Sequence, residues 1–179
     1  ALIRPTGTAS VVTRQPYRAG QTGKGAVGRT CRFAALLLPL MAGVFTRLVG
    51  QDAVEAELVA AALAARGDFA HNGNATGTMT HAWLVTGPPG SGRSVAALCF
   101  AAALQCTSDG VPGCGECRAC TTTMAGTHAD VRRIIPEGLS IGVDEMRNIV
   151  QIASRRPGTG RWQIVLIEDA DRLTEGAAN

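Results

Sequence analysis

A glycine-rich run between two apolar segments constrains the fold of this chain more than any other feature. Residues 87–94 read Gly-Pro-Pro-Gly-Ser-Gly-Arg-Ser, after the apolar run 81–86 and before the apolar run 95–105. Strand, glycine-rich turn and helix, in this order, are the context of the phosphate-binding motif G-x-x-x-x-G-K-[ST]. Such a loop binds phosphate through backbone N–H groups and the positive end of the following helix. A plain Gly-Pro turn is the alternative, but it leaves three glycines and a serine in register unexplained. The candidate nucleotide-binding residues are Gly87, Pro88, Pro89, Gly90, Ser91, Gly92, Arg93 and Ser94.

One position departs from the motif. Arg93 stands where the motif has lysine, a compact charge that reaches the β- and γ-phosphates. Arginine keeps the charge but is planar and larger, with a different hydrogen-bonding geometry. Ser94 retains the hydroxyl that would hold Mg²⁺. We therefore expect ATP with Mg²⁺ to bind weakly, if it binds, and ATP hydrolysis to be weak or absent.

Strand-like and helix-like segments alternate along the chain. Apolar spacing predicts helices over 52–66, 95–105 and 143–153, and strands over 81–86, 131–135 and 163–167. In the third helix the spacing predicts a buried face made of Val143, Met146, Val150 and Ala153. Such alternation is typical of an α/β fold with a parallel sheet flanked by helices.

Two acids follow the last predicted strand. Glu168 and Asp169 come directly after the apolar run 163–167. Acids at the end of a strand that follows a phosphate-binding loop position Mg²⁺ and the attacking water in many NTPases, in the order Asp then Glu. Here the order is reversed, so we interpret the pair as a degenerate form of that motif. Solvated surface acids are the alternative.

Four cysteines with tight spacing predict a metal site. Cys106, Cys114, Cys117 and Cys120 have the pattern C-x7-C-x2-C-x2-C, with glycines and a proline between them. Four thiolates suit tetrahedral Zn²⁺. Disulfides are the alternative, but thiols stay reduced in the cytosol, where we expect this protein.

Three further residues could be mistaken for ligands. His128 is near the cysteines, but four thiolates already complete a structural zinc site, so we expect His128 to be structural. Cys99 lies in the helix after the glycine-rich loop and is expected to be a small core residue. Cys31 stands apart from the other cysteines.

The first 40 residues differ in charge from the rest of the chain. They contain six basic residues and no acid, whereas residues 41–179 contain eleven basic residues and all 14 acids. Because they show no sustained hydrophobic period, we expect a non-native or disordered extension, with Met41 as the natural start. Residues 29–40 also fit a signal peptide, and the whole segment fits a transit peptide. The longest apolar run, 33–45, is too short to cross a bilayer.

The motifs occur in the order found in one protein family. Residues 48–51 (LVGQ) precede the glycine-rich loop, and the cysteine insertion directly follows its helix. Residues 125–130 (AGTHAD) and 141–147 (IGVDEMR) come next. From residue 44 to residue 179 the chain resembles the clamp-loader subunits of bacterial DNA polymerase III, which are AAA+ P-loop proteins.

This resemblance implies a function. Both the gamma/tau branch and the delta-prime branch of the family carry a zinc module, and the altered motifs favour delta-prime, a stator with little or no ATPase activity. The alternative is an active gamma/tau ATPase. The implied partners are delta and gamma/tau subunits in a hetero-pentamer and, through this complex, the sliding clamp and primer-template DNA. The complex serves a cytoplasmic DNA-directed DNA polymerase, a nucleotidyltransferase, and no membrane is involved.

The resemblance also divides the chain. Residues 41–179 are expected to be the N-terminal part of an AAA+ domain, with the zinc module at about 106–120. The domain would be incomplete, because the family continues past Asn179 with a helix, two strands, an arginine finger, a lid and a collar. Three hypotheses stay open: a non-catalytic assembly subunit, an active ATPase motor, and an unrelated zinc-bearing nucleotide-binding protein.

Overall fold

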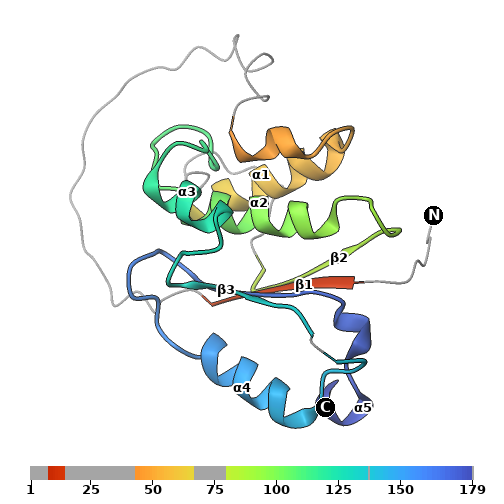
Figure 1. Ribbon diagram of the computed structural model, residues 1–179. Helices are drawn as coiled ribbons and strands as arrows, with labels where there is room; N and C mark the ends of the chain where they lie inside the picture. The colour runs from red at the N-terminus through yellow and green to blue at the C-terminus, as the bar shows by residue number, and fades with distance from the viewer. Residues whose placement is uncertain (1–7, 15–42, 67–79, 137, 179) are drawn as a thin grey trace.

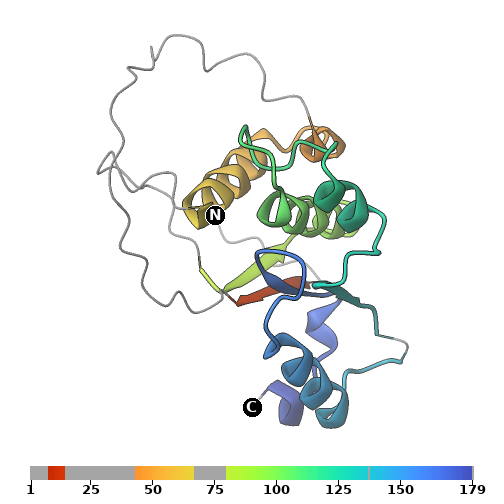
Figure 2. The same ribbon diagram turned by 90° about the vertical axis from the view of Figure 1, so that its left-hand side faces the viewer.

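A four-stranded sheet lies between two layers of helices. The computed structural model describes residues 8–14, 43–66, 80–136 and 138–178. One face of the sheet carries the 3-10 helix η1 (Val44–Arg47) and the helices α1 (Asp52–Arg66), α2 (Arg93–Gln105) and α3 (Arg118–Met124). The other face carries α4 (Val143–Ala153) and the short α5 (Glu175–Ala178), as both views show (Figures 1 and 2). None of the described helices has the length and apolar character needed to cross a membrane.

The sheet is mixed, whereas the sequence predicts a parallel one. Its strand order is β2 (Ala82–Thr86), β1 (Thr8–Arg14), β4 (Gln163–Ile167), β3 (Val131–Ile134). β3 and β4 pair in parallel, but β1 is antiparallel to both of its neighbours. β2, β3 and β4 therefore run in one direction and β1 runs against them. The parallel prediction rests on strands joined by helical crossovers, and β1 precedes the first of these units.

The strand β1 was not predicted. We expect no secondary structure in residues 1–40, and the structure differs from this expectation at Thr8–Arg14. This run, TASVVTR, contains four β-branched residues, which favour an extended backbone. Its pairing partners lie far away in the sequence, so no local pattern reveals it. The other residues before Gly43, including Cys31, the candidate signal segment 29–40 and Met41, lie outside the described residues.

The core is built on both faces of β4. Ile164 and Leu166 face the layer of α1 and α2, where they join a cluster with the buried run 99–104 of α2. Val165 and Ile167 face α4 and pack with Ile149. Because both faces are covered, every residue of β4 is buried, and from Ile164 to Ile167 the strand is a continuous apolar run.

The predicted elements are confirmed with small differences. The bounds of α1, α4 and β4 agree with the prediction, α2 begins two residues earlier than predicted, and α3 was not predicted. The predicted face of α4 is wrong in part. Its buried residue is Ile149, whereas Val143 and Val150 are 38% and 53% exposed. The helix is rotated so that Ile149, with Met146 and Ala153 beside it, contacts the β4 side chains.

Candidate nucleotide-binding pocket and metal centre

The glycine-rich segment forms a tight loop between β2 and α2. Gly90 and Gly92 have φ angles of +79° and +84°, a region that side chains disfavour. The Ser91 N–H donates to the Pro88 carbonyl at 3.1 Å, and α2 begins directly after Gly92. A Cβ on Gly87 would stand 2.5 Å from the Ser91 hydroxyl oxygen, so a larger residue here would have to move the Ser91 side chain. The loop thus brings backbone N–H groups to the start of α2, as phosphate binding requires.

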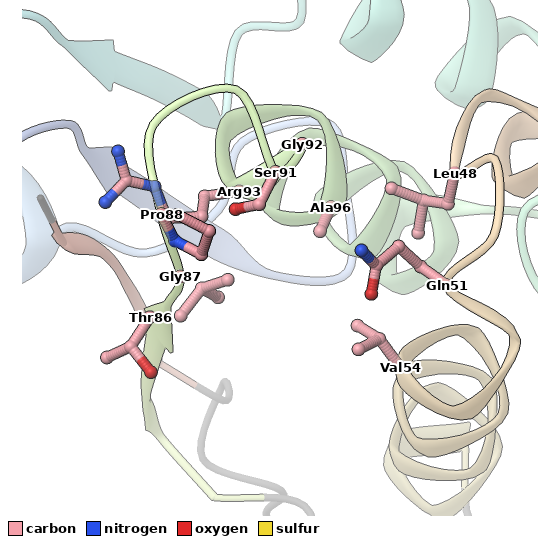
Figure 3. A pocket seen from close by; sticks show the side chains of 11 residues that line it. Leu48, Gln51, Val54, Thr86, Gly87, Pro88, Ser91, Gly92, Arg93 and Ala96 are labelled. Atoms are coloured by element: carbon pink, nitrogen blue, oxygen red, sulfur yellow. The ribbon is translucent and has the colours of Figure 1, made fainter. Parts of the chain in front are cut away.

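An open pocket lies beside this loop. It encloses about 460 Å³ of space, part of which is open to solvent. The loop residues Gly87, Pro88, Ser91, Gly92 and Arg93 line one side of it, as Figure 3 shows. Three of the predicted nucleotide-binding residues, Pro89, Gly90 and Ser94, are not among its lining residues.

The opposite wall of the pocket comes from a segment that sequence reasoning did not assign to the site. Leu48, Gln51 and Val54, from the end of η1 and the start of α1, face the glycine-rich loop across the pocket (Figure 3). Residues 48–51 contribute to the family resemblance, but nothing in their chemistry indicates contact with a loop some forty residues later. Val85, Thr86 and Ala96 complete the lining.

The side chain of Arg93 points in a direction that does not suit the phosphate-binding role of the motif lysine. In Figure 3 its guanidinium lies on the far side of the loop from Gln51 and Val54. The Ser91 hydroxyl points back toward Gly87. The loop therefore presents mainly backbone to this space, and the charge of Arg93 lies off to one side.

The two acids after β4 lie at the same sheet edge as the glycine-rich loop. β2 and β4 end at this edge with β1 between them, so their ends are two strand spacings, about 10 Å, apart. Glu168 accepts a hydrogen bond from Arg133, and Asp169 pairs with Arg172 at 3.2 Å. Asp169 also has a φ of +48°. Both carboxylates are engaged with arginines, and neither lines the pocket.

The four predicted ligand cysteines converge. Their sulfur atoms all lie within 4.8 Å of one another. The Sγ atoms of Cys106 and Cys114 are 3.7 Å apart, and those of Cys117 and Cys106 are 3.9 Å apart. A tetrahedron with Zn–S bonds of about 2.3 Å puts its sulfurs about 3.8 Å apart, so this arrangement fits one such ion.

The surroundings of two of these thiols favour the charged form that a metal needs. Although burial raises the pKa of Cys117, hydrogen bonds from Thr107 and Cys120 lower it to about 6. Burial also raises the pKa of Cys106, but hydrogen bonds from Cys114, Ser108 and Gly113 bring it below its ordinary value. In the opposite direction, burial raises the pKa of Cys120. Two thiols are thus prepared for deprotonation, and a cation would have to hold Cys120 as a thiolate.

Local backbone structure explains why these sulfurs meet. Gly113 and Gly115 have φ angles of +85° and +80°, which turn the chain on either side of Cys114. Cys117 then caps α3 by accepting the N–H of Cys120 on its sulfur at 3.4 Å. Helix α3 carries Cys120, which is buried, back under the other sulfurs.

The residues expected to lie outside the metal centre do so. Cys99 is fully buried in the core, and its thiol donates to the Val44 carbonyl at 3.1 Å. Burial raises the pKa of Cys99 to about 11, so it stays protonated. His128 Nδ1 accepts the N–H of Asp130 at 3.1 Å, which is a structural role.

Known proteins resemble the part of the chain that carries these sites. A family model described as "DNA polymerase III, delta subunit" matches residues 68–179. DNA polymerase III subunit delta' of Pseudomonas aeruginosa is 38% identical over 102 residues, 55% of this chain and 31% of that protein. The Bacillus subtilis subunit delta' is 32% identical over 101 residues, 56% and 31% of the two chains. The B. subtilis subunit tau is 35% identical over 101 residues, 56% and 18% of the two chains.

The matches cover only part of each relative. The chain spans about a third of the length of the delta' relatives that it matches. No solved structure matches it significantly. The family model covers more than half of the chain, from just after α1 to the C-terminal residue. The chain therefore belongs to the DNA polymerase III, delta subunit family.

Proposed function

We propose that this chain is part of a clamp-loader subunit of the delta-prime type, which helps to load the sliding clamp onto primed DNA during replication. The observation that carries the proposal is the family match over residues 68–179, supported by several relatives named subunit delta'. Residues 41–179 are the N-terminal part of its AAA+ domain, and the strand β1 pairs into the sheet of this part. Its partners are delta and gamma/tau subunits in a hetero-pentamer and, through that assembly, the clamp and primer-template DNA. The protein acts in the cytoplasm.

A reconstitution experiment tests this proposal. The intact protein is combined with delta and gamma/tau subunits, a labelled clamp and primed DNA, and the amount of clamp retained on DNA is measured. We expect clamp loading to depend on the added protein. Equal loading in its absence, with the protein also failing to co-purify with the other subunits, would contradict the proposal.

We propose further that the pocket binds nucleotide weakly and turns it over slowly. The loop geometry supports phosphate binding, because the backbone N–H groups of the loop and of the first turn of α2 do not depend on which side chain stands at position 93. Hydrolysis needs more, since phosphoryl transfer depends on charges placed around the transition state. Arg93 points away from the wall of the pocket, and Glu168 and Asp169 are each engaged with an arginine.

An active gamma/tau ATPase is the second candidate, favoured by the similarity to B. subtilis subunit tau. The two candidates differ in steady-state phosphate release by the intact protein. We compare the wild type with a triple variant, Arg93→Lys, Glu168→Asp and Asp169→Glu, and use Gly92→Val to subtract contaminating ATPases. We expect negligible release by the wild type. Turnover near 1 s⁻¹, roughly the low end for competent enzymes, would favour the motor subunit.

For the four-cysteine centre we propose Zn²⁺ as a structural ion. Cys106, Cys114, Cys117 and Cys120 would hold it. The support is the fit of the sulfur separations to a tetrahedral S₄ site and the lowered thiol pKa values of Cys106 and Cys117. Four thiolates leave no open position on the ion, so its role is to fix the fold.

A further inference from the structure

One wall of the pocket is attached at both ends to the four-cysteine module. The wall consists of Leu48, Gln51 and Val54, which lie within the segment 44–66 formed by η1 and α1. The module consists of the loop between Cys106 and Cys117 together with α3. The two attachments are made by Val44 and Arg66, which are the first and last residues of this segment.

The first attachment is at Val44. Its N–H donates to the Gly113 carbonyl at 2.9 Å. The backbones come so close here that a Cβ on Gly43 would lie 2.1 Å from the Gly113 carbonyl oxygen, and a Cβ on Gly113 would lie 2.8 Å from Val44 Cγ2. From the other side, the Cys99 thiol donates to the Val44 carbonyl. Val44 is thereby fixed between the module and α2.

The second attachment is at Arg66, the last residue of α1. Its guanidinium donates to the carbonyls of Ser108 and Gly110, both at 2.9 Å, and to that of Cys106 at 3.3 Å. Together with Gly113, four carbonyls of the run 106–113 therefore hold the two ends of the wall segment. This run is the stretch between the first two cysteines.

Between these attachments the wall is continuous. The N–H groups of Leu48, Gln51 and Glu55 donate to the carbonyls of Phe45, Leu48 and Gln51, respectively. Backbone hydrogen bonds therefore continue from η1 into α1. Leu48 is 5% exposed, while its neighbour Val49 is 88% exposed. Leu48 Cδ2 reaches within 3.9 Å of the position that a Cβ on Gly92 would occupy. A shift at Val44 is therefore passed to the side chains that face the glycine-rich loop.

We propose that the four-cysteine module is the clip that holds this pocket wall in place, so that metal binding and nucleotide binding favour each other. The run 106–113 contains Gly110, Pro112 and Gly113 and forms no helix or strand. An ion that binds Cys106 and Cys114 fixes both ends of this run, and with them the four carbonyls that hold Val44 and Arg66. The inference rests on the proposed nucleotide and zinc sites. The coupling is reciprocal, and typical values predict a loss of affinity of about fivefold or more without the metal.

The test separates the attachment from the metal ligands. Gly43→Ala puts a methyl group against the Gly113 carbonyl and leaves all four cysteines intact. Gly126→Ala is the control for a side chain at a positive φ, since Gly126 has a φ of +73° with open space around it. Gly110→Ala is the control within the loop, where the new methyl group meets only Ser108 Oγ at 3.8 Å. Each variant of the intact protein is assayed for bound zinc, for amide hydrogen exchange over residues 44–51, and for affinity for a fluorescent ATP analogue.

We expect Gly43→Ala to keep its zinc, to exchange faster over residues 44–51 and to bind the analogue at least about fivefold more weakly. Both controls should match the wild type. Removing zinc from the wild type with a chelator should reproduce the change in exchange. The inference is overturned if chelation leaves exchange over 44–51 unchanged, or if the wild type contains no metal. If the wild type binds no nucleotide, the proposed nucleotide function and the coupling to it fail, while the exchange experiment still decides whether the module holds the wall in place.

Discussion

Asp130 shows how much one buried carboxylate can organise. It is 5% exposed, and its oxygens accept the N–H groups of Gly158, Thr159 and Gly160 at 2.6–2.7 Å and the Thr159 hydroxyl at 2.8 Å. Burial alone would raise the pKa of Asp130, but these donors lower it to about 2. Asp130 therefore stabilises the turn that leads from α4 into β4.

Because the pKa of Asp130 is low, we expect the stability of the fold to depend on pH. A carboxylate whose pKa is lower in the folded state than in the unfolded state stabilises the fold above the unfolded value, near 3.8, and the stabilisation is lost as pH falls toward 2. A shift of this size corresponds to roughly 2 to 3 kcal/mol. We expect Asp130→Asn to lower the free energy of unfolding by about this amount at pH 7 and by much less at pH 2.5. Urea unfolding at both pH values measures it, and equal losses at the two values would contradict the role of the charge.

The cysteines make a second prediction at this scale. We expect one Zn²⁺ per chain, held by Cys106, Cys114, Cys117 and Cys120, and we expect Cys117→Ser to lose the ion and destabilise the module. Cys99→Ser is the control, because Cys99 lies outside the cluster and should leave the zinc content unchanged. Elemental analysis of the purified protein decides the matter. Less than roughly 0.2 zinc per chain would rule out a site of this kind.

Among the elements, α4 is one whose bounds the helical pattern predicts but whose buried face it does not. Its bounds follow from the sequence, but its orientation depends on which side chains reach β4. Ile149 is 3% exposed and packs with Val165 and Ile167, while its neighbour Val150 is 53% exposed. We expect Ile149→Ala to cost about 2–4 kcal/mol of stability and Val150→Ala about 0.5 kcal/mol or less. Thermal or urea unfolding of the two variants measures this difference, and similar losses would mean that the helix is rotated toward the predicted face.

The same contrast explains which elements could be predicted. The helices α1 and α4 follow from helical apolar spacing, and the strand β4 follows from a short continuous apolar run, so a local pattern predicts each of them. β1 could not be predicted, since an isolated run of β-branched residues becomes a strand only when β2 and β4 pair with it. Long-range pairing leaves no local periodic signal.

The candidate sites divide in a similar way. The four cysteines could be assigned because a metal site needs chemically distinct ligands at short spacing, and the sulfurs do converge. The glycine-rich loop was likewise visible, although Ser94 and Gly90 do not line the pocket. Leu48 and Gln51 were missed as wall residues, since ordinary side chains become part of a site only through tertiary contacts. Asp130 was missed because its partners lie on a distant turn.

At the scale of the whole molecule, β1 occupies the middle of the sheet. It provides the pairing partner for both β2 and β4, which do not pair with each other. We expect a protein expressed from Met41 to be less soluble than the full chain, because its β2 and β4 edges would be unpaired. If residues 1–40 were a dispensable extension, as the sequence alone predicts, the two proteins would instead be equally soluble. Soluble yield and hydrogen exchange of β2 and β4 in the two proteins distinguish these outcomes, and mass spectrometry of the native protein shows whether residues 1–40 are translated.

The position of β1 also has a consequence for how the chain is made. Arg14 pairs with Gln163, so these two strands can pair only after the whole stretch between them has been synthesised. Helices α1 and α2 complete their own hydrogen bonds locally and can form early. Until β4 has been synthesised, the nascent chain therefore carries an extended segment with at least one unpaired edge, which could pair with other chains. Translation speed between residues 14 and 163, and chaperones that bind this segment, should consequently influence the yield of folded protein.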